Sequence, residues 1–270
     1  MPIEVSQLNY YPVKSCAGIS LSKAQICTRG IEHDREWAVW DVHSRTVLTQ
    51  RQAAKLCLIK ASVQNSGAAV ALQLNVEAMS PLEIPVVDSE EVETTFPWGP
   101  VCRGLDQGDA AAKWLSSYLE RECRLLHFSP SFVRQVDQQV AKRPTDQTGF
   151  ADDCAFLLLS DESLRELNSQ LVEPLPTNRF RPNIVVRGAT SYAEDDWKVI
   201  RIGDVVFDVL QKCGRCVITT VNQADASKGV EPLHTLAKHR KFGNKLMFGV
   251  HLAHRANGSI ALHDEVEVLE

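Results

Sequence analysis

Short segments of β character fill the first hundred residues of the chain, and they constrain its fold more than any other feature. Turn residues such as Gly18, Arg29-Gly30 and Ser66-Gly67 separate these segments. The expected strands are 3–10, 19–27, 36–42, 57–64, 69–76 and 97–103. Many short strands with few helices predict a barrel or a sandwich rather than a doubly wound sheet.

From residue 106 onward the sequence mixes helices with further strands. Apolar residues at helical spacing predict a helix over 106–120, with an Asp at its N-cap. Ser160 is expected to cap a helix that runs to Leu171, and Pro232 to begin a short helix to His239. Further strands are expected over 123–128, 155–159, 184–187, 198–202, 205–210, 216–221, 247–254 and 265–269. The fold class is therefore mainly β with a few helices (α+β).

A polar stretch, 129–149, contains two prolines and four glutamines and has no strong periodicity. A structureless segment of this length is uncommon in a compact domain and is often a lid or a linker. A flexible surface loop is an equally good interpretation, and the sequence does not decide between them.

Composition places the chain among globular proteins and limits its partners. It has 270 residues, 44% of them hydrophobic, which allows one large domain or two small ones. The net charge of −5 gives no reason to expect nucleic-acid binding. The sequence shows no apolar run of the roughly 20 residues that span a bilayer, and no secretory signal. We therefore expect a cytoplasmic protein, without a membrane span, whose eight cysteines are thiols.

The sharpest local motif is Lys212-Cys213-Gly214-Arg215-Cys216, which precedes an expected strand. Neighbouring cations favour the thiolate, which is the form that binds metal or attacks an electrophile. The sequence has no second Cys-x-x-Cys to complete a structural zinc site, and a thioredoxin-like motif would precede a helix. A soft metal held by one thiolate and by a cofactor remains open, and so do two packed thiols.

Several arginines and one lysine stand at strand boundaries. In Asn178–Asn183 two arginines flank Phe180, which suits either a phosphate contact or a surface turn paired with Asp195 or Asp196. Lys14-Ser15 ends a strand before Gly18, which suits an anion contact or a simple bulge. Together with Arg35, Arg51, Arg181 and Arg215, these residues indicate one anionic ligand in an otherwise acidic protein.

Other common catalytic patterns are missing from the sequence. His251 and His254 are spaced by three on an expected strand, which puts them on opposite faces and argues against zinc. The sequence contains neither a serine nucleophile elbow nor a dinucleotide-binding Gly-x-Gly-x-x-Gly.

Taken in order, the motifs resemble those of the MOSC-domain proteins, and in particular the mitochondrial amidoxime reducing component and its bacterial relatives. The matching stretches are YPVKSCAG (11–18), GIEHDREWAV (30–39), LTQRQ (48–52), FADDCAFLLLSDESLRELN (150–168), RFRPNIVV (179–186), YAEDDW (192–197) and CGRCVITTV (213–221). Since unrelated motifs recur in the same order over most of the chain, the resemblance is specific.

The resemblance implies a β-rich N-terminal domain, expected over 1–120, that packs on a MOSC β-barrel over 121–270. Between them would lie the molybdenum cofactor (Mo-molybdopterin). The family's metal-binding and catalytic cysteine falls on Cys216. Its cofactor-binding residues fall on Lys14, Ser15, Arg35, Thr49, Arg51, Arg181 and Asn183, and we add Arg215 as a neighbour of the thiolate.

The implied activity is that of a molybdenum-dependent oxidoreductase that reduces small N-hydroxylated compounds, amidoximes or hydroxylamines, with release of water. The alternative is a cofactor-binding or sulfur-carrier module with a persulfide on Cys216. The sequence lacks the targeting segment of mitochondrial members and the Cys-x4-Cys-x2-Cys motif of a ferredoxin domain. We therefore expect a separate electron donor, which is a ferredoxin-, flavoprotein- or cytochrome b5-like protein. Arg179 is an additional residue directly before the family's Phe-Arg-Pro-Asn core.

Overall fold

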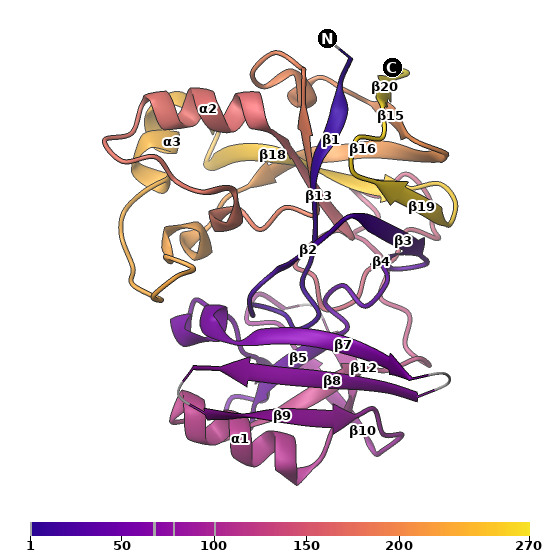
Figure 1. Cartoon of the computed structure of the whole chain (residues 1–270), viewed down its shortest axis with the longest axis vertical. Coiled ribbons are helices and arrows are strands. Elements are labelled where there is room, and N and C mark those ends of the chain that lie inside the picture. Colours follow the sequence, from indigo (N-terminus) through magenta and orange to yellow (C-terminus); the bar gives the residue numbers. More distant parts are fainter. Residues whose placement is uncertain (1, 67–68, 78, 100) are drawn as a thin grey trace.

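A computed structural model of the chain describes residues 2–66, 69–77, 79–99 and 101–270. It consists of two β-rich halves, one above the other in Figure 1. The expected fold class, mainly β with a few helices, is confirmed.

The upper half is a nine-stranded sheet that curls round on itself. Its strands run in the order β2 (Ile19–Leu21), β1 (Glu4–Tyr10), β14 (Ile184–Arg187), β13 (Phe156–Ser160), β18 (Lys245–His254), β16 (Val205–Gly214), β15 (Val199–Ile202) and β20 (Val266–Val268), and β17 (Lys241–Phe242) pairs with β18. The amide of Val266 donates to the carbonyl of Ile3 (2.8 Å), and the amide of Val5 to that of Asp264 (3.0 Å), so the last strand returns to β1.

A second, three-stranded sheet of the upper half shares the core of the large one. It comprises β19 (Gly258–Ala261), β3 (Lys23–Cys27) and β4 (Gly30–Ile31). Ile26 and Ile260 from these strands pack in one cluster with Phe156 and Phe207 of the large sheet, whose rings meet edge to face.

The lower half is built round a closed barrel of β10 (Glu91–Thr95), β11 (Val101–Asp106), β12 (Cys123–Phe128), β5 (Trp37–Asp41) and β6 (Thr46–Val47). A meander of β7 (Lys60–Ser66), β8 (Ala69–Val76) and β9 (Met79–Pro85) lies beside it, as Figure 1 shows. Helix α1 (Asp109–Leu119) buries Trp114 and Leu115 in a cluster with Leu72 and Leu74 of β8, and so joins the meander to the barrel.

Two α-helices of the upper half and four 3-10 turns complete the described elements. Helix α2 (Asp161–Ser169) begins after Ser160, whose hydroxyl accepts from the amide of Ser163 (3.1 Å), as expected for this N-cap. Helix α3 (Leu233–His239) follows Pro232. The 3-10 turns are η1 (Ala54–Leu58), η2 (Thr177–Arg179), η3 (Ala193–Asp195) and η4 (Val217–Thr220).

Several sequence expectations were wrong in detail. The segment 216–221 is the 3-10 turn η4 rather than a strand. The first helix begins at Asp109, after Gly108 as N-cap, because Asp106 still belongs to β11. Strands β4, β9, β10, β17 and β19 were not anticipated. The expected strand 19–27 is divided into β2 and β3, and the expected strand 97–103 begins later, at Val101. The turn expected at Ser66-Gly67 lies partly outside the described residues.

Strands from both sides of residue 120 occur in each half of the structure. Strand β1 pairs with β14 in the upper half, whereas β12 pairs with β11 and β5 in the lower half. The division into 1–120 and 121–270 stays a prediction.

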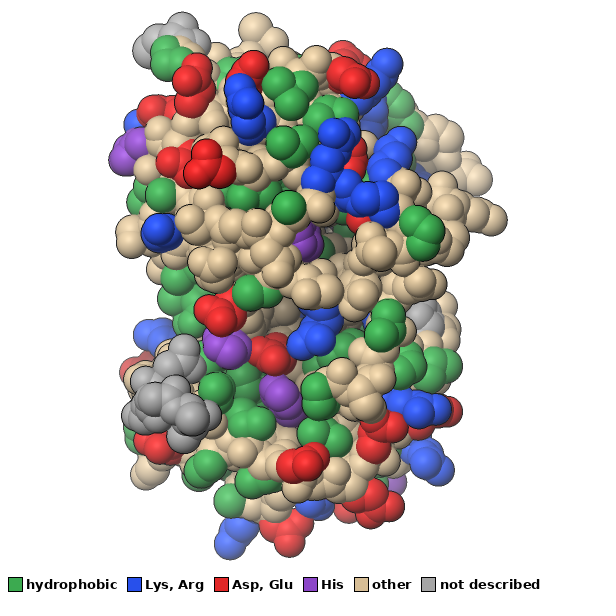
Figure 2. All heavy atoms as spheres, turned by 90° about the vertical axis from the view of Figure 1, so that its right-hand side faces the viewer, with side chains coloured by type: hydrophobic (Ala, Val, Ile, Leu, Met, Phe, Trp, Pro, Cys, Tyr) green, Lys and Arg blue, Asp and Glu red, His purple; other side chains and the backbone are tan. Residues whose placement is uncertain are grey.

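On the face shown in Figure 2, acidic and basic side chains are interspersed over both halves. Among the described helices, none combines the length and apolar character needed to cross a bilayer.

Candidate functional site

The expected site residues come from loops that meet between the two halves. Lys14 and Ser15 follow β1, where the amide of Lys14 donates to the carbonyl of Trp37 (2.8 Å), and Ser15 adopts a left-handed φ of 68°. Both side chains are buried, although they are polar. The cavity between the halves is lined by Lys14, Ser15, Arg35, Arg181, Asn183, Cys213, Arg215 and Cys216 among others.

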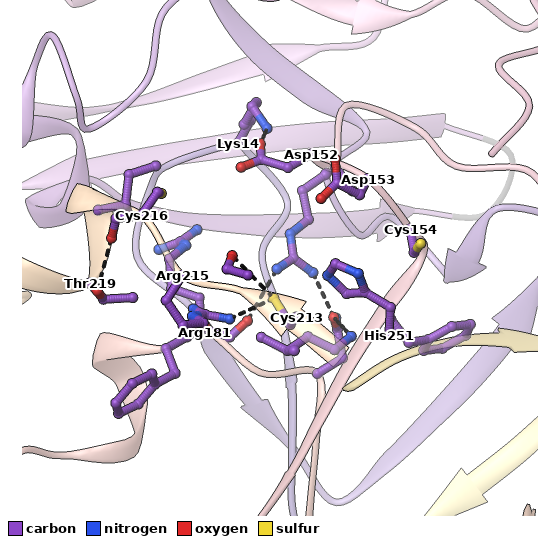
Figure 3. A pocket seen from close by; sticks show the side chains of 18 of the residues that line it. Lys14, Asp152, Asp153, Cys154, Arg181, Cys213, Arg215, Cys216, Thr219 and His251 are labelled. Carbon is purple, nitrogen blue, oxygen red and sulfur yellow. Dashed lines mark hydrogen bonds and ion pairs between the residues drawn. The ribbon is translucent and has the colours of Figure 1, made fainter. Parts of the chain in front are cut away.

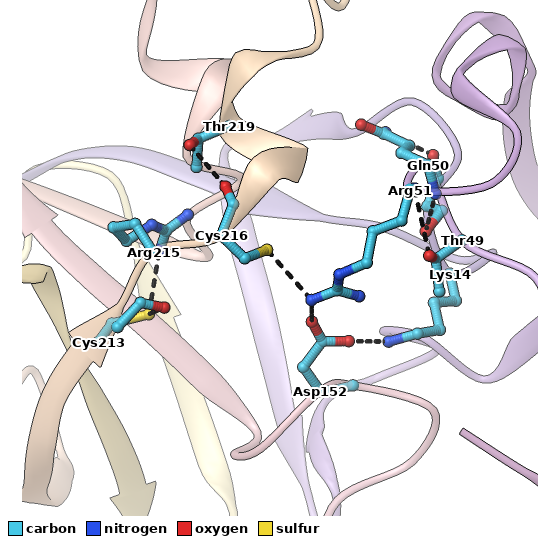
Figure 4. A network of polar contacts seen from close by, with 12 residues as sticks. Lys14, Thr49, Gln50, Arg51, Asp152, Cys213, Arg215, Cys216 and Thr219 are labelled. Atoms are coloured by element: carbon cyan, nitrogen blue, oxygen red, sulfur yellow. Dashed lines mark hydrogen bonds and ion pairs between the residues drawn. The ribbon is translucent and has the colours of Figure 1, made fainter. Parts of the chain in front are cut away.

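A chain of polar contacts leads from Lys14 to Cys216 (Figure 4). Lys14 pairs with Asp152, whose second carboxylate oxygen lies 3.6 Å from Arg51 Nη2. The same Nη2 donates to Cys216 Sγ at 3.1 Å. Cys216 is partly exposed and stands directly before η4, where its carbonyl accepts from the Thr219 hydroxyl (2.9 Å). The guanidinium of Arg51 therefore lies directly against the Cys216 sulfur.

Asp152 was missed in the sequence, although it lies in the centre of this chain. Burial opposes its ionisation, but the charge of Lys14, followed by that of Arg51, lowers the pKa of Asp152 to about 2. Burial lowers the pKa of Lys14 to about 8, and Asp152 counteracts part of that effect. The one sequence signal was an acidic pair, Asp152-Asp153, directly before a strongly apolar strand.

Arg35, Arg181 and Asn183 form a second group around Tyr11. Both guanidiniums lie 4.2 Å from the centre of the Tyr11 ring. Arg35 donates to Asn183 Oδ1 (2.9 Å) and pairs with Asp34, and Arg181 Nη1 donates to the carbonyl of Cys16 (2.7 Å). Asp34 balances the charge of Arg35. The guanidinium of Arg181 forms no ion pair with a carboxylate among the described residues.

The other expected residues have different surroundings. Thr49 is not among the residues that line the cavity. Its hydroxyl donates to Gln52 Oε1 (2.6 Å) and accepts from the amide of Arg51 (3.3 Å). Thr49 therefore fixes the turn that presents Arg51. Gln50, which the sequence did not single out, is fully buried and donates to the carbonyl of Ser15 (2.7 Å).

Arg179 lies away from the cavity and has a structural role. Its guanidinium donates to the carbonyls of Thr219 (2.9 Å) and Glu231 (3.1 Å). The alternative interpretation of 178–183, a surface turn paired with Asp195 or Asp196, was wrong. Asp195 pairs instead with Arg240 and with Lys212 (3.3 Å).

Aromatic rings that the sequence did not single out stand against the cations of the site. The guanidinium of Arg51 lies 4.3 Å from the centre of the Trp98 ring, and Lys14 Nζ lies 4.8 Å from that of Phe96. Contacts of this geometry stabilise a cation by about 0.5–2 kcal/mol. They hold Arg51 beside Cys216 and Lys14 beside Asp152.

Three arginines of the site retain unused hydrogen-bond donors. Arg51 Nη1, Arg181 Nη2 and Arg215 Nε are buried, and none of them has a hydrogen-bond partner among the described residues. Buried donors on cations are costly to leave unpaired, so the arrangement is suited to an anion with several acceptor oxygens, such as a phosphate. In the described part of the chain, no group of three or more His, Cys, Asp and Glu side chains is placed to hold a metal ion. The unused donors of the three arginines therefore fit a cofactor that carries a phosphate.

We expect Asp152→Asn to lower the free energy of unfolding at pH 7 by about 1–2 kcal/mol, a value reduced because the Asp152 side chain is 39% exposed. The pKa of Asp152 falls from 3.8 to about 2 on folding, so its contribution is fully present well above pH 3.8 and is lost progressively as the pH falls from 3.8 through about 2. As the pH rises through about 8, Lys14 loses its charge in the folded state, and the contribution of the pair fades.

Urea unfolding at pH 3, 6 and 9 checks this expectation, with the largest difference at pH 6. Asp153→Asn is the matched control, because Asp153 is exposed and forms no ion pair among the described residues. An equal loss of stability in both variants would contradict the role of Asp152.

Comparison with known proteins identifies relatives over the whole chain. Residues 3–122 match the family model of the MOSC N-terminal beta barrel domain, and residues 145–267 match that of the MOSC domain. The chain is 34% identical over 284 residues to mitochondrial amidoxime-reducing component 1 of Homo sapiens, covering 98% of this chain and 82% of that protein. It is also 30% identical over 269 residues to molybdenum cofactor sulfurase of Arabidopsis thaliana, covering 91% of this chain and 32% of that protein.

Proposed function

The chain belongs to the family whose members join a MOSC N-terminal beta barrel domain to a MOSC domain, and on this premise we propose that it is a molybdenum-cofactor-dependent reductase of N-hydroxylated compounds. Its relatives are amidoxime-reducing components and molybdenum cofactor sulfurases, which relates the chain to molybdenum-cofactor proteins. The single observation that carries the proposal is the partly exposed Cys216 thiol among arginines with unused buried donors.

The proposed binding residues divide by chemistry. Cys216 would bind the metal, because a thiolate is the ligand type that soft metals prefer. The phosphate and the pterin would be held by polar groups that face the cavity or support those that do, namely Lys14, Ser15, Arg35, Thr49, Arg51, Arg181, Asn183 and Arg215. When bound, the cofactor supplies the two electrons that cleave the N–O bond of an amidoxime or hydroxylamine.

The chain's own residues would hold the thiolate and supply protons. Arg51 Nη2 donates to Cys216 Sγ and orients that sulfur toward the cavity residues around it. Reduction of an N–OH group to N–H and water consumes two protons along with the two electrons. Asp152 stays ionised near neutral pH, whereas the pKa of Lys14, about 8, allows this buried ammonium to give up a proton. Electrons would come from a separate ferredoxin-, flavoprotein- or cytochrome b5-like protein. The cytoplasmic location stays a prediction.

The test is a metal and turnover measurement on protein purified from a molybdenum-replete host. We expect about one molybdenum atom per chain and conversion of benzamidoxime to benzamidine with a chemical or protein reductant. Protein that retains molybdenum and forms no amidine would contradict the reductase proposal.

The resemblance to molybdenum cofactor sulfurase favours one other function, a sulfur carrier with a persulfide on Cys216. In that case Cys216 would take up a sulfane sulfur that mass spectrometry detects as an added sulfur atom on its peptide. Persulfide formation on Cys216 without benzamidoxime turnover would favour the carrier.

A further inference from the structure

A second cysteine lies in the same cavity, away from the chain of contacts that ends at Cys216 (Figure 3). Cys213 is near the end of β16, and His251 belongs to the neighbouring strand β18, where it pairs with Gln211. Arg215 Nη1 donates to Cys213 Sγ at 3.0 Å. Cys213 is 6% exposed and His251 8% exposed, so both are buried in the wall of the cavity.

His251 has an unused polar atom in this wall. Its Nδ1 is buried without a hydrogen-bond partner among the described residues. In Figure 3 the ring extends between Cys213 and Cys154. A buried imidazole with a free nitrogen is placed to exchange a proton with a small molecule in the cavity.

The two cationic or protonatable groups beside Cys213, Arg215 and His251, have no carboxylate in the described part of the chain to balance them. Among the described residues, neither Arg215 nor His251 forms an ion pair with a carboxylate, and Arg215 Nη2 donates only to the carbonyl of Phe180 (2.7 Å). Burying cations without an anion is costly, which favours the Cys213 thiolate as their counter-charge. Burial by itself would raise the pKa of Cys213, but the charges of Arg215 and His251 outweigh it and lower that pKa to about 7.

The same electrostatics act on the histidine. Burial disfavours the imidazolium, yet the charge of Cys213 raises the pKa of His251 well above its ordinary value. The other charged or titratable groups that line the cavity are Lys14, Arg35, Asp152, Asp153, Cys154 and Arg181. Of these, Asp152 is engaged by Lys14 and Arg35 is paired with Asp34.

We propose that Cys213, held between Arg215 and His251, is a second reactive thiolate of this chain and the site at which a hydroperoxide oxidises it. The cavity has a volume of about 120 Å³. Since one water occupies about 30 Å³ in the liquid, hydrogen peroxide fits the cavity of the cofactor-free chain.

In the proposed step the Cys213 sulfur attacks one peroxide oxygen. An S–O bond forms as the O–O bond breaks, the sulfur is oxidised by two electrons, and the peroxide is reduced by two. The leaving hydroxide takes the proton of the His251 imidazolium and departs as water. The product is a sulfenic acid on Cys213, which a thiol can reduce again.

Cys154 provides an internal control within the same wall. It is 6% exposed, like Cys213, lines the same cavity and also interacts with His251, but its sulfur accepts no hydrogen bond from a guanidinium among the described residues. Cys16 is a second control, because complete burial raises the pKa of its thiol to about 12.

The first experiment exposes the purified chain at pH 7 to hydrogen peroxide, quenches with catalase, and unfolds the protein in dimedone. Trapping after unfolding makes all cysteines equally accessible to dimedone. We expect at least about fivefold more adduct on the Cys213 peptide than on those of Cys154 and Cys16. Equal adduct on Cys154 and Cys213, or none on Cys213, would overturn the proposal.

The second experiment follows the alkylation rate of Cys213 by iodoacetamide as a function of pH. In the unaltered chain we expect the rate to rise with a midpoint near pH 7, and His251→Gln to move that midpoint upward by about one pH unit or more. His251→Gln should also slow peroxide oxidation of Cys213 at pH 7 by about threefold or more. A midpoint above about pH 8.5 in the unaltered chain, the ordinary value for a thiol, is incompatible with the proposal, whether or not the variant folds.

Discussion

The Cys216→Ser variant is expected to be purified with less than about a tenth of the molybdenum of the unaltered protein, and to lose at least about 100-fold in benzamidoxime reduction. A serine hydroxyl remains protonated near neutral pH and is a poor ligand for a soft metal, whereas a cysteine sulfur is the ligand type that such metals prefer. Arg51 Nη2 holds Cys216 Sγ in place at 3.1 Å. Elemental analysis and a turnover assay on the same sample measure both effects.

Cys213→Ser is the matched control for this substitution. Cys213 is three residues earlier, at the end of β16, and its sulfur contacts Arg215 rather than Arg51. We expect this variant to retain molybdenum within about twofold of the unaltered protein, because no metal contact is assigned to Cys213. If Cys213→Ser lost the metal and Cys216→Ser kept it, the ligand assignment would have to be exchanged between the two cysteines.

The fold class followed from the sequence because most strands and helices carry local signals. Ser160 followed by Asp161 and Glu162 has the composition of a helix start, and α2 begins there. Strand β9 was hidden because Pro81 and Pro85 stand within it, and proline normally excludes a strand unless it lies at an edge. The structure confirms that exception, since β9 is the outer strand of its meander.

The segment 216–221 shows where local propensity misleads. Val217, Ile218 and Val221 favour a strand. In the structure, however, the hydroxyls of Thr219 and Thr220 donate to carbonyls three residues earlier, at 2.9 and 2.8 Å, and stabilise the 3-10 turn η4. This turn leaves the Cys216 side chain partly exposed.

The basic residues at strand boundaries already indicated one anionic ligand, but the assignment of the cofactor and of Cys216 as its metal ligand came from the family resemblance. Lys14, Arg51 and Cys216 are far apart in the chain, and their proximity results from the meeting of loops between the two halves. Asp152 and Trp98 were missed because a single acidic or aromatic residue in a sequence does not reveal which way its side chain points. The contacts of Asp152 with Lys14 and Arg51 became apparent only in three dimensions.

Arg181→Met is expected to weaken retention of the cofactor by about 10- to 100-fold, which is the effect of losing one or two charge-assisted hydrogen bonds to a phosphate. Arg181 Nη1 is held by the carbonyl of Cys16 (2.7 Å) and the guanidinium packs on Tyr11, which leaves the buried Nη2 free for a ligand. Methionine retains the apolar contact with the ring and removes the charge. Molybdenum and pterin per chain, measured after serial dilution and filtration, report the loss.

Arg179→Met separates this binding role from a structural one. Arg179 is two residues away, and its guanidinium donates to the carbonyls of Thr219 and Glu231 rather than facing the cavity. Loss of the Arg179 guanidinium should lower the free energy of unfolding by about 1–3 kcal/mol, because one buried and one partly buried carbonyl lose their donor. The molybdenum content of the folded protein should remain near that of the unaltered chain. Arg181→Lys should fall between Arg181→Met and the unaltered chain, because the charge remains but the paired geometry of the guanidinium is lost. Equal cofactor loss in Arg179→Met and Arg181→Met would mean that this segment acts on the cofactor through the stability of the loop, and that the unused Nη2 of Arg181 is not its anchor.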